Sequence, residues 1–115
     1  MTFPKEFNRR IDDPQLLLIG ELAGYAPVQG TGTVAGNPFY FRARWEEWSF
    51  AISDDPEVDV LDICVPESAQ YGFFAEAVVP GGPYAASSLS YDTAESIIKD
   101  CCRQYLAARG IGTGA

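Results

Sequence analysis

Apolar and polar residues alternate most regularly between residues 39 and 53. The apolar positions are Phe39, Phe41 and Ala43 and, after a bend at residues 45–47, Trp48, Phe50 and Ile52. A period of two places successive side chains on opposite faces of a strand. The pattern therefore predicts an antiparallel hairpin with one face packed inward. Its other face carries Tyr40, Arg42 and Arg44 towards solvent or a partner.

Near the end of the chain, apolar residues recur at intervals of three and four residues. The apolar stripe consists of Ala94, Ile97, Ile98, Cys101, Tyr105 and Ala108. One apolar stripe at this spacing predicts an amphipathic helix. Ser90 is a good N-cap, and Gly110 is placed to end the helix. Neighbouring side chains on a helix point about 100° apart, so we expect at most one of Cys101 and Cys102 to face the core.

A second helix is expected near the start of the chain. Asp13 followed by Pro14 is typical of a helix start, since aspartate caps the first turn and proline lacks only an N–H that this turn does not use. The next residues are largely apolar, so we expect a short helix over residues 14–24. A buried strand is the alternative, because periodicity alone does not separate a short apolar helix from a short apolar strand.

The remaining segments indicate a lead-in, turns and short strands. We expect an extended lead-in over residues 1–12 (with Phe3 and Phe7 against the body), a flexible connection or short edge strand over 27–38, strands at 58–65, 71–79 and 84–89, and a flexible tail at 111–115. The sum is a single α+β domain, residues 1–115. An antiparallel sheet of three to five strands has a short N-terminal helix and a C-terminal amphipathic helix packed on one face. The other face stays available.

Composition limits the chemistry. The 115-residue chain contains no histidine, which removes the commonest general base and the commonest metal ligand. We therefore expect no enzyme activity, no cofactor and no metal. A weak calcium or magnesium site in the acidic run of residues 54–62 is the alternative. An EF-hand loop starting at Asp55 fails there, because Val60 and Pro66 stand where glycine and glutamate are required.

Apolar runs and cysteines indicate the compartment. No apolar run approaches the roughly 18 residues of a membrane span, and the first residues lack the apolar stretch of a signal peptide. The three cysteines, Cys64, Cys101 and Cys102, are an odd number and suit reduced thiols. We expect a cytoplasmic protein of bacterial or phage type.

Charge is distributed unevenly along the chain. Residues 45–98 contain no lysine or arginine, yet they hold eleven of the 16 acidic residues of a chain whose net charge is −8. An ordinary soluble surface intersperses the two signs. Segregation of this kind attracts basic partners and repels nucleic acid and anionic membranes. We expect the carboxylates to gather on one side of the folded domain.

Nine residues form the predicted partner-binding site. They are Tyr40, Trp45, Glu46, Glu47, Asp54, Asp55, Glu57, Asp59 and Asp62. Tyrosine and tryptophan beside a charged rim are typical of binding hot spots. Trp45, on the predicted bend, is best placed to be an exposed anchor. Core packing of the aromatic residues and simple solubility of the acidic ones are the alternative explanations.

These features favour a small acidic protein-binding module, an inhibitor or nucleic-acid-mimic decoy that covers a basic surface of another protein. The analogy, of size and charge only, is with phage proteins that block restriction or CRISPR machinery. The alternatives are a toxin-neutralising immunity protein and a small structural or assembly subunit that pairs through an exposed sheet edge. The expected partner is a basic protein, such as a nucleic-acid-binding protein or a toxin. Direct binding to nucleic acid or membrane is not expected.

Overall fold

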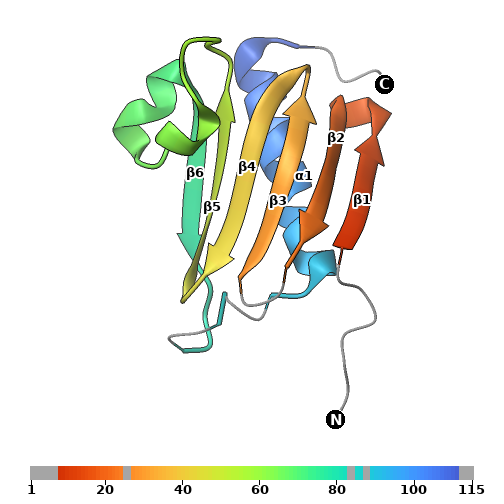
Figure 1. Ribbon diagram of the computed structural model, residues 1–115, viewed down its shortest axis with the longest axis vertical. Helices are drawn as coiled ribbons and strands as arrows, with labels where there is room; N and C mark the ends of the chain where they lie inside the picture. Colours follow the sequence, from red (N-terminus) through yellow and green to blue (C-terminus); the bar gives the residue numbers. More distant parts are fainter. Residues whose placement is uncertain (1–7, 25–26, 83–84, 87–88, 112–115) are drawn as a thin grey trace.

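Six antiparallel strands form one sheet in the computed structural model, which describes residues 8–24, 27–82, 85–86 and 89–111 (Figure 1). The strands are β1 (Asn8–Asp13), β2 (Leu18–Ala23), β3 (Val28–Val34), β4 (Asn37–Arg44), β5 (Glu47–Ser53) and β6 (Gly72–Val78). Each strand pairs with the one before it, so the sheet is a meander with β1 and β6 at its edges. The α+β class is confirmed, with one strand more than the predicted maximum.

The predicted hairpin is confirmed as β4 and β5. Phe39, Phe41 and Phe50 are buried on its inner face. The rings of Phe39 and Phe50 stack with their centroids 5.5 Å apart. Buried and exposed positions therefore alternate along β4 as the sequence predicts, because the apolar side chains of one face are removed from water together.

The long helix α1 (Tyr91–Arg109) covers one face of the sheet (Figure 1). Its ends are as predicted. The Ser90 hydroxyl accepts a hydrogen bond from the Thr93 N–H at 3.1 Å, and Gly110 adopts the left-handed conformation with φ of 68°. The N–H of Ile111 then donates to the carbonyl of Leu106 at 2.9 Å, which satisfies a carbonyl of the last turn. Ile111 is thus tied to the helix, and the rest of the predicted flexible tail lies outside the described residues.

The buried stripe of α1 is wider than predicted, but Ala108 at its predicted end is exposed. Ile98 and Tyr105 are buried as expected, but Cys101 and Cys102 are both buried, so the prediction that at most one faces the core is wrong. Leu106, one turn after Cys102, is buried as well. A sheet surface is broad enough to contact two adjacent rows of helix side chains, and α1 uses both.

Residues 14–24 do not form the predicted helix. Pro14–Leu16 makes a single 3₁₀ turn (η1), and Leu18–Ala23 is strand β2. The capping prediction itself is right, since the Asp13 carboxylate accepts a hydrogen bond from the Gln15 N–H at 3.1 Å. Leu17 then adopts a left-handed φ of 53°, which ends the turn. The buried strand, the alternative, is the correct interpretation, because pairing on both sides outweighs the local helix signal.

Two predicted connections are also strands. Residues 8–12 of the lead-in belong to β1, whereas Phe3 and Phe7 lie outside the described residues. Most of the turn-rich segment 27–38 is β3, an interior strand of the sheet.

Glycine in β2 and β3 serves close packing. Gly20 and Gly32 face each other across the two strands. A Cβ on Gly20 would stand 2.7 Å from the ring of Phe39, and one on Gly32, whose φ is 151°, would collide with the carbonyl of Ile19. The missing side chain of Gly20 leaves room for the Phe39 ring, and that of Gly32 lets the backbones of β2 and β3 approach each other. A glycine-rich composition that is typical of a loop therefore belongs here to the middle of the sheet.

The predicted strand at 58–65 is absent. The connection between β5 and β6 contains two 3₁₀ turns, η2 (Val60–Asp62) and η3 (Pro66–Tyr71). The Asp55 and Asp59 carboxylates accept backbone hydrogen bonds from Glu57 and Leu61, each at 2.9 Å. Such local bonds compete with strand pairing. Ile63 is nevertheless buried, because this connection folds back over one end of the sheet.

The predictions for residues 71–79 and 84–89 differ in outcome. A strand at 71–79 is confirmed as β6. In the segment 84–89, Tyr84 lies outside the described residues, and the described Ala85 and Ala86 lie in a turn and not in a strand.

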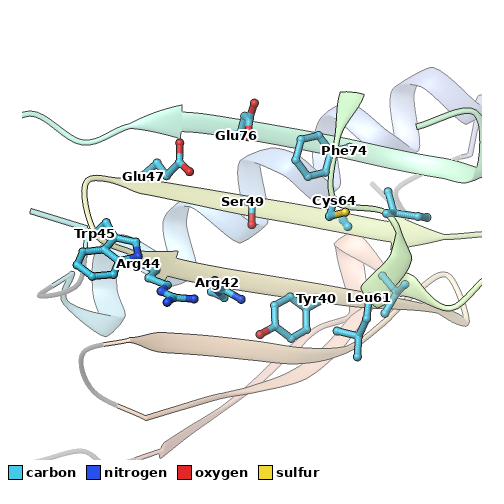
Figure 2. Close-up of a pocket in the computed structure, with 13 residues that line it drawn as sticks. Tyr40, Arg42, Arg44, Trp45, Glu47, Ser49, Leu61, Cys64, Phe74 and Glu76 are labelled. Carbon is cyan, nitrogen blue, oxygen red and sulfur yellow. The ribbon is translucent and has the colours of Figure 1, made fainter. Parts of the chain in front are cut away.

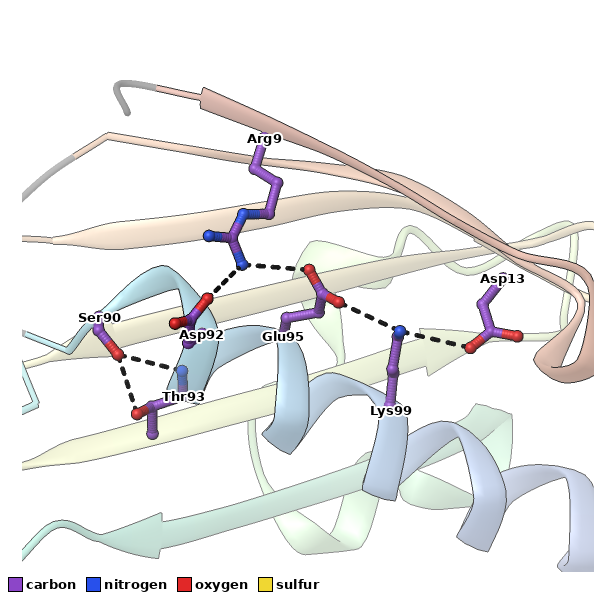
Figure 3. A network of polar contacts seen from close by, with 7 residues as sticks. All are labelled: Arg9, Asp13, Ser90, Asp92, Thr93, Glu95 and Lys99. Atoms are coloured by element: carbon purple, nitrogen blue, oxygen red, sulfur yellow. Dashed lines mark hydrogen bonds and ion pairs between the residues drawn. The ribbon is translucent and has the colours of Figure 1, made fainter. Parts of the chain in front are cut away.

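A chain of ion pairs ties the edge strand β1 to α1 (Figure 3). Arg9 contacts Asp92 at 2.9 Å and Glu95 at 3.3 Å. Lys99 contacts Glu95 at 3.1 Å and Asp13 at 3.4 Å. The hydrogen bond from Lys99 to Glu95 is the main reason that the pKa of Lys99 is raised. The ammonium group therefore stays charged and paired throughout the neutral range.

Replacement of Ile98 tests the helix packing. Ile98→Ala is expected to lower the free energy of unfolding by about 2–4 kcal/mol, because it leaves a cavity between α1 and the sheet. Ser96→Ala, at an exposed position of the same helix, is the control and should have little effect. Chemical denaturation measures both. An unchanged midpoint for Ile98→Ala would contradict the packing described above.

Candidate binding face on the open side of the sheet

The face of the sheet opposite α1 carries a hollow of about 500 Å³ (Figure 2). Strands β4, β5 and β6 form its floor, the hairpin turn borders one end, and residues 60–64 of the β5–β6 connection form a wall at the other. Since α1 packs on the opposite side of these strands, the hollow is a surface feature of the uncovered face.

Strand register places three rows of side chains on the floor. They are Tyr40–Ala51–Phe74, Arg42–Ser49–Glu76 and Arg44–Glu47–Val78, each written from β4 across β5 to β6. Directly paired residues of antiparallel strands point to the same face. The first row is mainly aromatic, and the other two have a cation on β4 and a carboxylate on β5 or β6.

The charged groups of the floor do not form ion pairs with one another. Arg42, Glu47 and Glu76 make no ion pair and no side-chain hydrogen bond within the described part of the chain. Arg44 lies over the ring of Trp45, with its guanidinium carbon 5.3 Å from the ring centroid. Figure 2 shows the two arginines on one strand and the two glutamates on the neighbouring ones. The floor can thus pair with charged groups of either sign.

Trp45 occupies the hairpin turn in a backbone conformation that is unfavourable for it. Its φ is 59°, a value that two-residue hairpin turns normally assign to glycine or asparagine. Its carbonyl accepts a hydrogen bond from the Ala86 N–H at 2.9 Å, which anchors the turn. Trp45 is 51% exposed. The predicted exposure of Trp45 is therefore confirmed, and its role as a partner contact stays a prediction.

The predicted acidic residues do not form one continuous patch. Glu46 and Glu47 lie at the hairpin turn, whereas Asp54, Asp55, Glu57, Asp59 and Asp62 follow the opposite end of β5. The seven residues of β5 separate the two groups by roughly 20 Å. Asp92 and Glu95 belong to α1 and pair there with basic residues. A hairpin necessarily places its turn and its open end at opposite ends of a sheet, and this divides the charge.

Asp54 differs from its acidic neighbours. Its carboxylate contacts Arg109 at 2.8 Å and the Tyr105 hydroxyl at 3.2 Å. These contacts attach the end of β5 to α1, so Asp54 has a structural role. In contrast, eight of the eleven acidic residues between positions 45 and 98 make no ion pair within the described chain: Glu46, Glu47, Asp55, Glu57, Asp59, Asp62, Glu67 and Glu76.

Two useful residues of this face were not among the nine predicted ones. Phe74 and Glu76 come from β6 and line the hollow. Their alternation around Ala75 is visible in the sequence, and it indicates a strand. Which strand lies beside β6 depends on how the long connection from 54 to 71 folds, and no local pattern shows that. Arg42 and Arg44 were expected on the outer face, and their position there is confirmed.

The described part of the chain holds no group of three cysteine, aspartate or glutamate side chains able to hold a metal ion. None of the described helices combines the length and apolarity needed to cross a membrane. In comparisons with known proteins, no family model, curated protein or solved structure matches this chain.

The three thiols are expected to differ in reactivity. Cys64 is exposed at the wall of the hollow, whereas burial raises the pKa of Cys101 and of Cys102 to about 12. The two buried thiols stay protonated at neutral pH and are poor nucleophiles. A chromogenic thiol reagent should therefore titrate one cysteine in the native protein and three after denaturation. Rapid labelling of all three in the native state would contradict the packing of α1.

Trp45→Gly tests whether the turn holds tryptophan at a conformational cost. A left-handed conformation costs a residue with a side chain about 1–2 kcal/mol, so glycine should leave the Tm unchanged or raise it. Trp48→Ala is the matched control. Trp48 is partly buried and stacks on Phe41 with centroids 6.3 Å apart, and its loss should lower the Tm. A clear loss of stability in Trp45→Gly would assign Trp45 a structural role.

Proposed function

We propose that this protein is a binding module that engages a basic surface of another protein with the open face of its sheet. The observation that carries the proposal is the group of acidic residues without ion-pair partners on and around the hollow, close to a half-exposed tryptophan. Unpaired carboxylates beside aromatic side chains suit a cationic partner that buries apolar stems and pairs its charges.

The two acidic groups have different parts in this proposal. Glu47 and Glu76 line the hollow, and Glu46 lies at the adjoining turn. They are positioned to contact the partner directly. The acidic residues of the β5–β6 connection do not line the hollow. In a chain whose net charge is −8, they add to a negative field that speeds the approach of a basic molecule.

Binding to a basic partner favours an inhibitory role. A protein that covers a cationic surface blocks whatever that surface normally holds, and cationic surfaces commonly hold nucleic acid. The proposal is thus an inhibitor or decoy of a basic, nucleic-acid-binding protein. The open face provides the contact area, and α1 on the other side keeps the sheet rigid.

Selection of short random peptides displayed on a carrier provides the probe. We expect the peptides retained at low salt to be rich in lysine and arginine, and their affinity to fall as salt is added, because screening weakens exposed charge pairs. Glu46→Lys combined with Glu47→Lys should reduce the affinity of a selected peptide about tenfold or more, equivalent to about 1.4 kcal/mol. Calorimetry or fluorescence anisotropy measures the change.

A control of equal charge separates contact from net charge. Lysine at four exposed, uncharged positions of α1, Ser96→Lys, Gln104→Lys, Ala107→Lys and Ala108→Lys, changes the net charge by the same amount on the other side of the sheet without breaking an ion pair. This variant should lose much less affinity. If it binds as weakly as the Glu46→Lys, Glu47→Lys variant, only the overall charge matters. If no basic peptide is retained at low salt, the proposed function is wrong.

A further inference from the structure

The two edges of the sheet are protected differently. Strand β1 carries four charged residues among its six, and its Arg9 pairs with α1. Strand β6 (GFFAEAV) has one charged residue among seven. Val78 on β6 is 65% exposed. A long, largely apolar edge strand is a template for pairing with another strand unless it is covered.

Hydrogen bonding at the ends of β6 shows which backbone groups face outward. The Val79 N–H donates to the Glu46 carbonyl at 2.6 Å, and the Asp54 N–H donates to the Tyr71 carbonyl at 3.1 Å. In an antiparallel pair every second residue exchanges hydrogen bonds with its partner strand. Residues 73, 75 and 77 therefore bond to β5, and the N–H and C=O groups of Phe74, Glu76 and Val78 point away from it.

Contacts of neighbouring residues agree with this assignment. The carbonyl of Gly72, which also faces outward, accepts a hydrogen bond from Arg109 at 2.8 Å. Beyond Gly72, the outward groups of Phe74, Glu76 and Val78 have no partner within the described chain. The edge is thus closed by Arg109 at its start and open over its last five residues.

The open edge and the hollow belong to the same surface. The side chains of Phe74, Glu76 and Val78 lie on the face that carries the hollow. A strand added to β6 would place every second side chain on that face, beside these three residues. An apolar side chain would contact Phe74 or Val78, and a basic one would reach Glu76, with Glu47 on the adjacent strand (Figure 2).

We propose that the basic partner inserts an extended segment that pairs with β6 as a seventh strand. This inference rests on the proposed function and specifies how the partner is held: backbone hydrogen bonds to Phe74, Glu76 and Val78 supply affinity, and alternating apolar and basic side chains supply selectivity. A second copy of this chain is a poorer occupant. Each copy has a net charge of −8, and antiparallel pairing of β6 with its copy brings the two Glu76 carboxylates near each other.

Proline at position 78 separates backbone pairing from charge. The N–H of Val78 is not used by β5, so Val78→Pro removes an outward donor and obstructs an added strand while the existing sheet stays paired. We expect Val78→Pro to keep a Tm near that of the parent protein and to bind a selected basic peptide about tenfold or more weakly. Val78→Ala, which retains the N–H, is the matched control and should bind within about threefold of the parent.

Amide hydrogen exchange provides a second measurement that does not depend on the folding of the proline variant. On addition of the basic peptide, exchange should slow at Phe74, Glu76 and Val78 and stay unchanged at the outward amides of β1. Two N-methylated versions of the peptide, one methylated at the odd and one at the even backbone positions, should differ. The version whose methyl groups replace the N–H groups that face β6 should no longer protect these amides, and the other version should still protect them.

The outcomes distinguish this inference from the proposed function. If Val78→Pro binds like the parent while Glu76→Gln weakens binding, the partner is held by charge alone, and strand addition is overturned while the proposed function stands. If the β6 amides are protected without peptide in a concentration-dependent manner, a second copy occupies the edge and the inference is overturned. If no basic peptide binds either protein, both proposals fail.

Discussion

The packing of α1 against the inner face of the sheet is the interaction on which the rest of this structure depends. Ile98, Tyr105, Cys101 and Cys102 of the helix share one buried core with the phenylalanines of β4 and β5. Gly20 has no side chain to occupy the space that the Phe39 ring fills. Burial of apolar area is the dominant stabilising term in a domain of this size. One helix is enough to cover this face, and no second layer covers the other among the described elements.

An uncovered sheet face and two unequal edges follow from that arrangement. The β5–β6 connection covers one end of the open face with Ile63 and leaves the hollow between itself and the hairpin turn. At one edge, ion pairs from Arg9 and Lys99 bind the charged strand β1 to the helix. At the other, Arg109 reaches only the first residue of β6. Among the described residues, this asymmetry leaves β6 as the edge available to the extended segment proposed above.

Acidic residues that lie in one stretch of the sequence are spread over several parts of the folded structure. Residues 45–98 contain eleven carboxylates and no cation, but the fold distributes them over the hairpin turn, the β5–β6 connection and the helix. Basic residues from the two ends of the chain return to three of them: Arg109 to Asp54, and Arg9 to Asp92 and Glu95. What remains unpaired lies around the open face and not around the helix. This selective neutralisation, more than the total charge, is the basis for proposing the open face as the place of contact.

Local patterns in the sequence determined the elements whose signals are repeated over many residues. The β4–β5 hairpin, helix α1 with its Ser90 and Gly110 ends, the Asp13 cap and the outward position of Tyr40, Arg42 and Arg44 all follow from periodicity and capping chemistry. Tertiary structure alone decided that residues 18–23 are a strand and that the glycine-rich segment is an interior strand of the sheet. It also decided that residues 58–65 are not a strand and that Glu76 and Glu47 line the same hollow. These features depend on which strands become neighbours across long connections. Pairing and burial between distant segments outweigh preferences of well under 1 kcal/mol per residue, which are all that a local sequence pattern expresses.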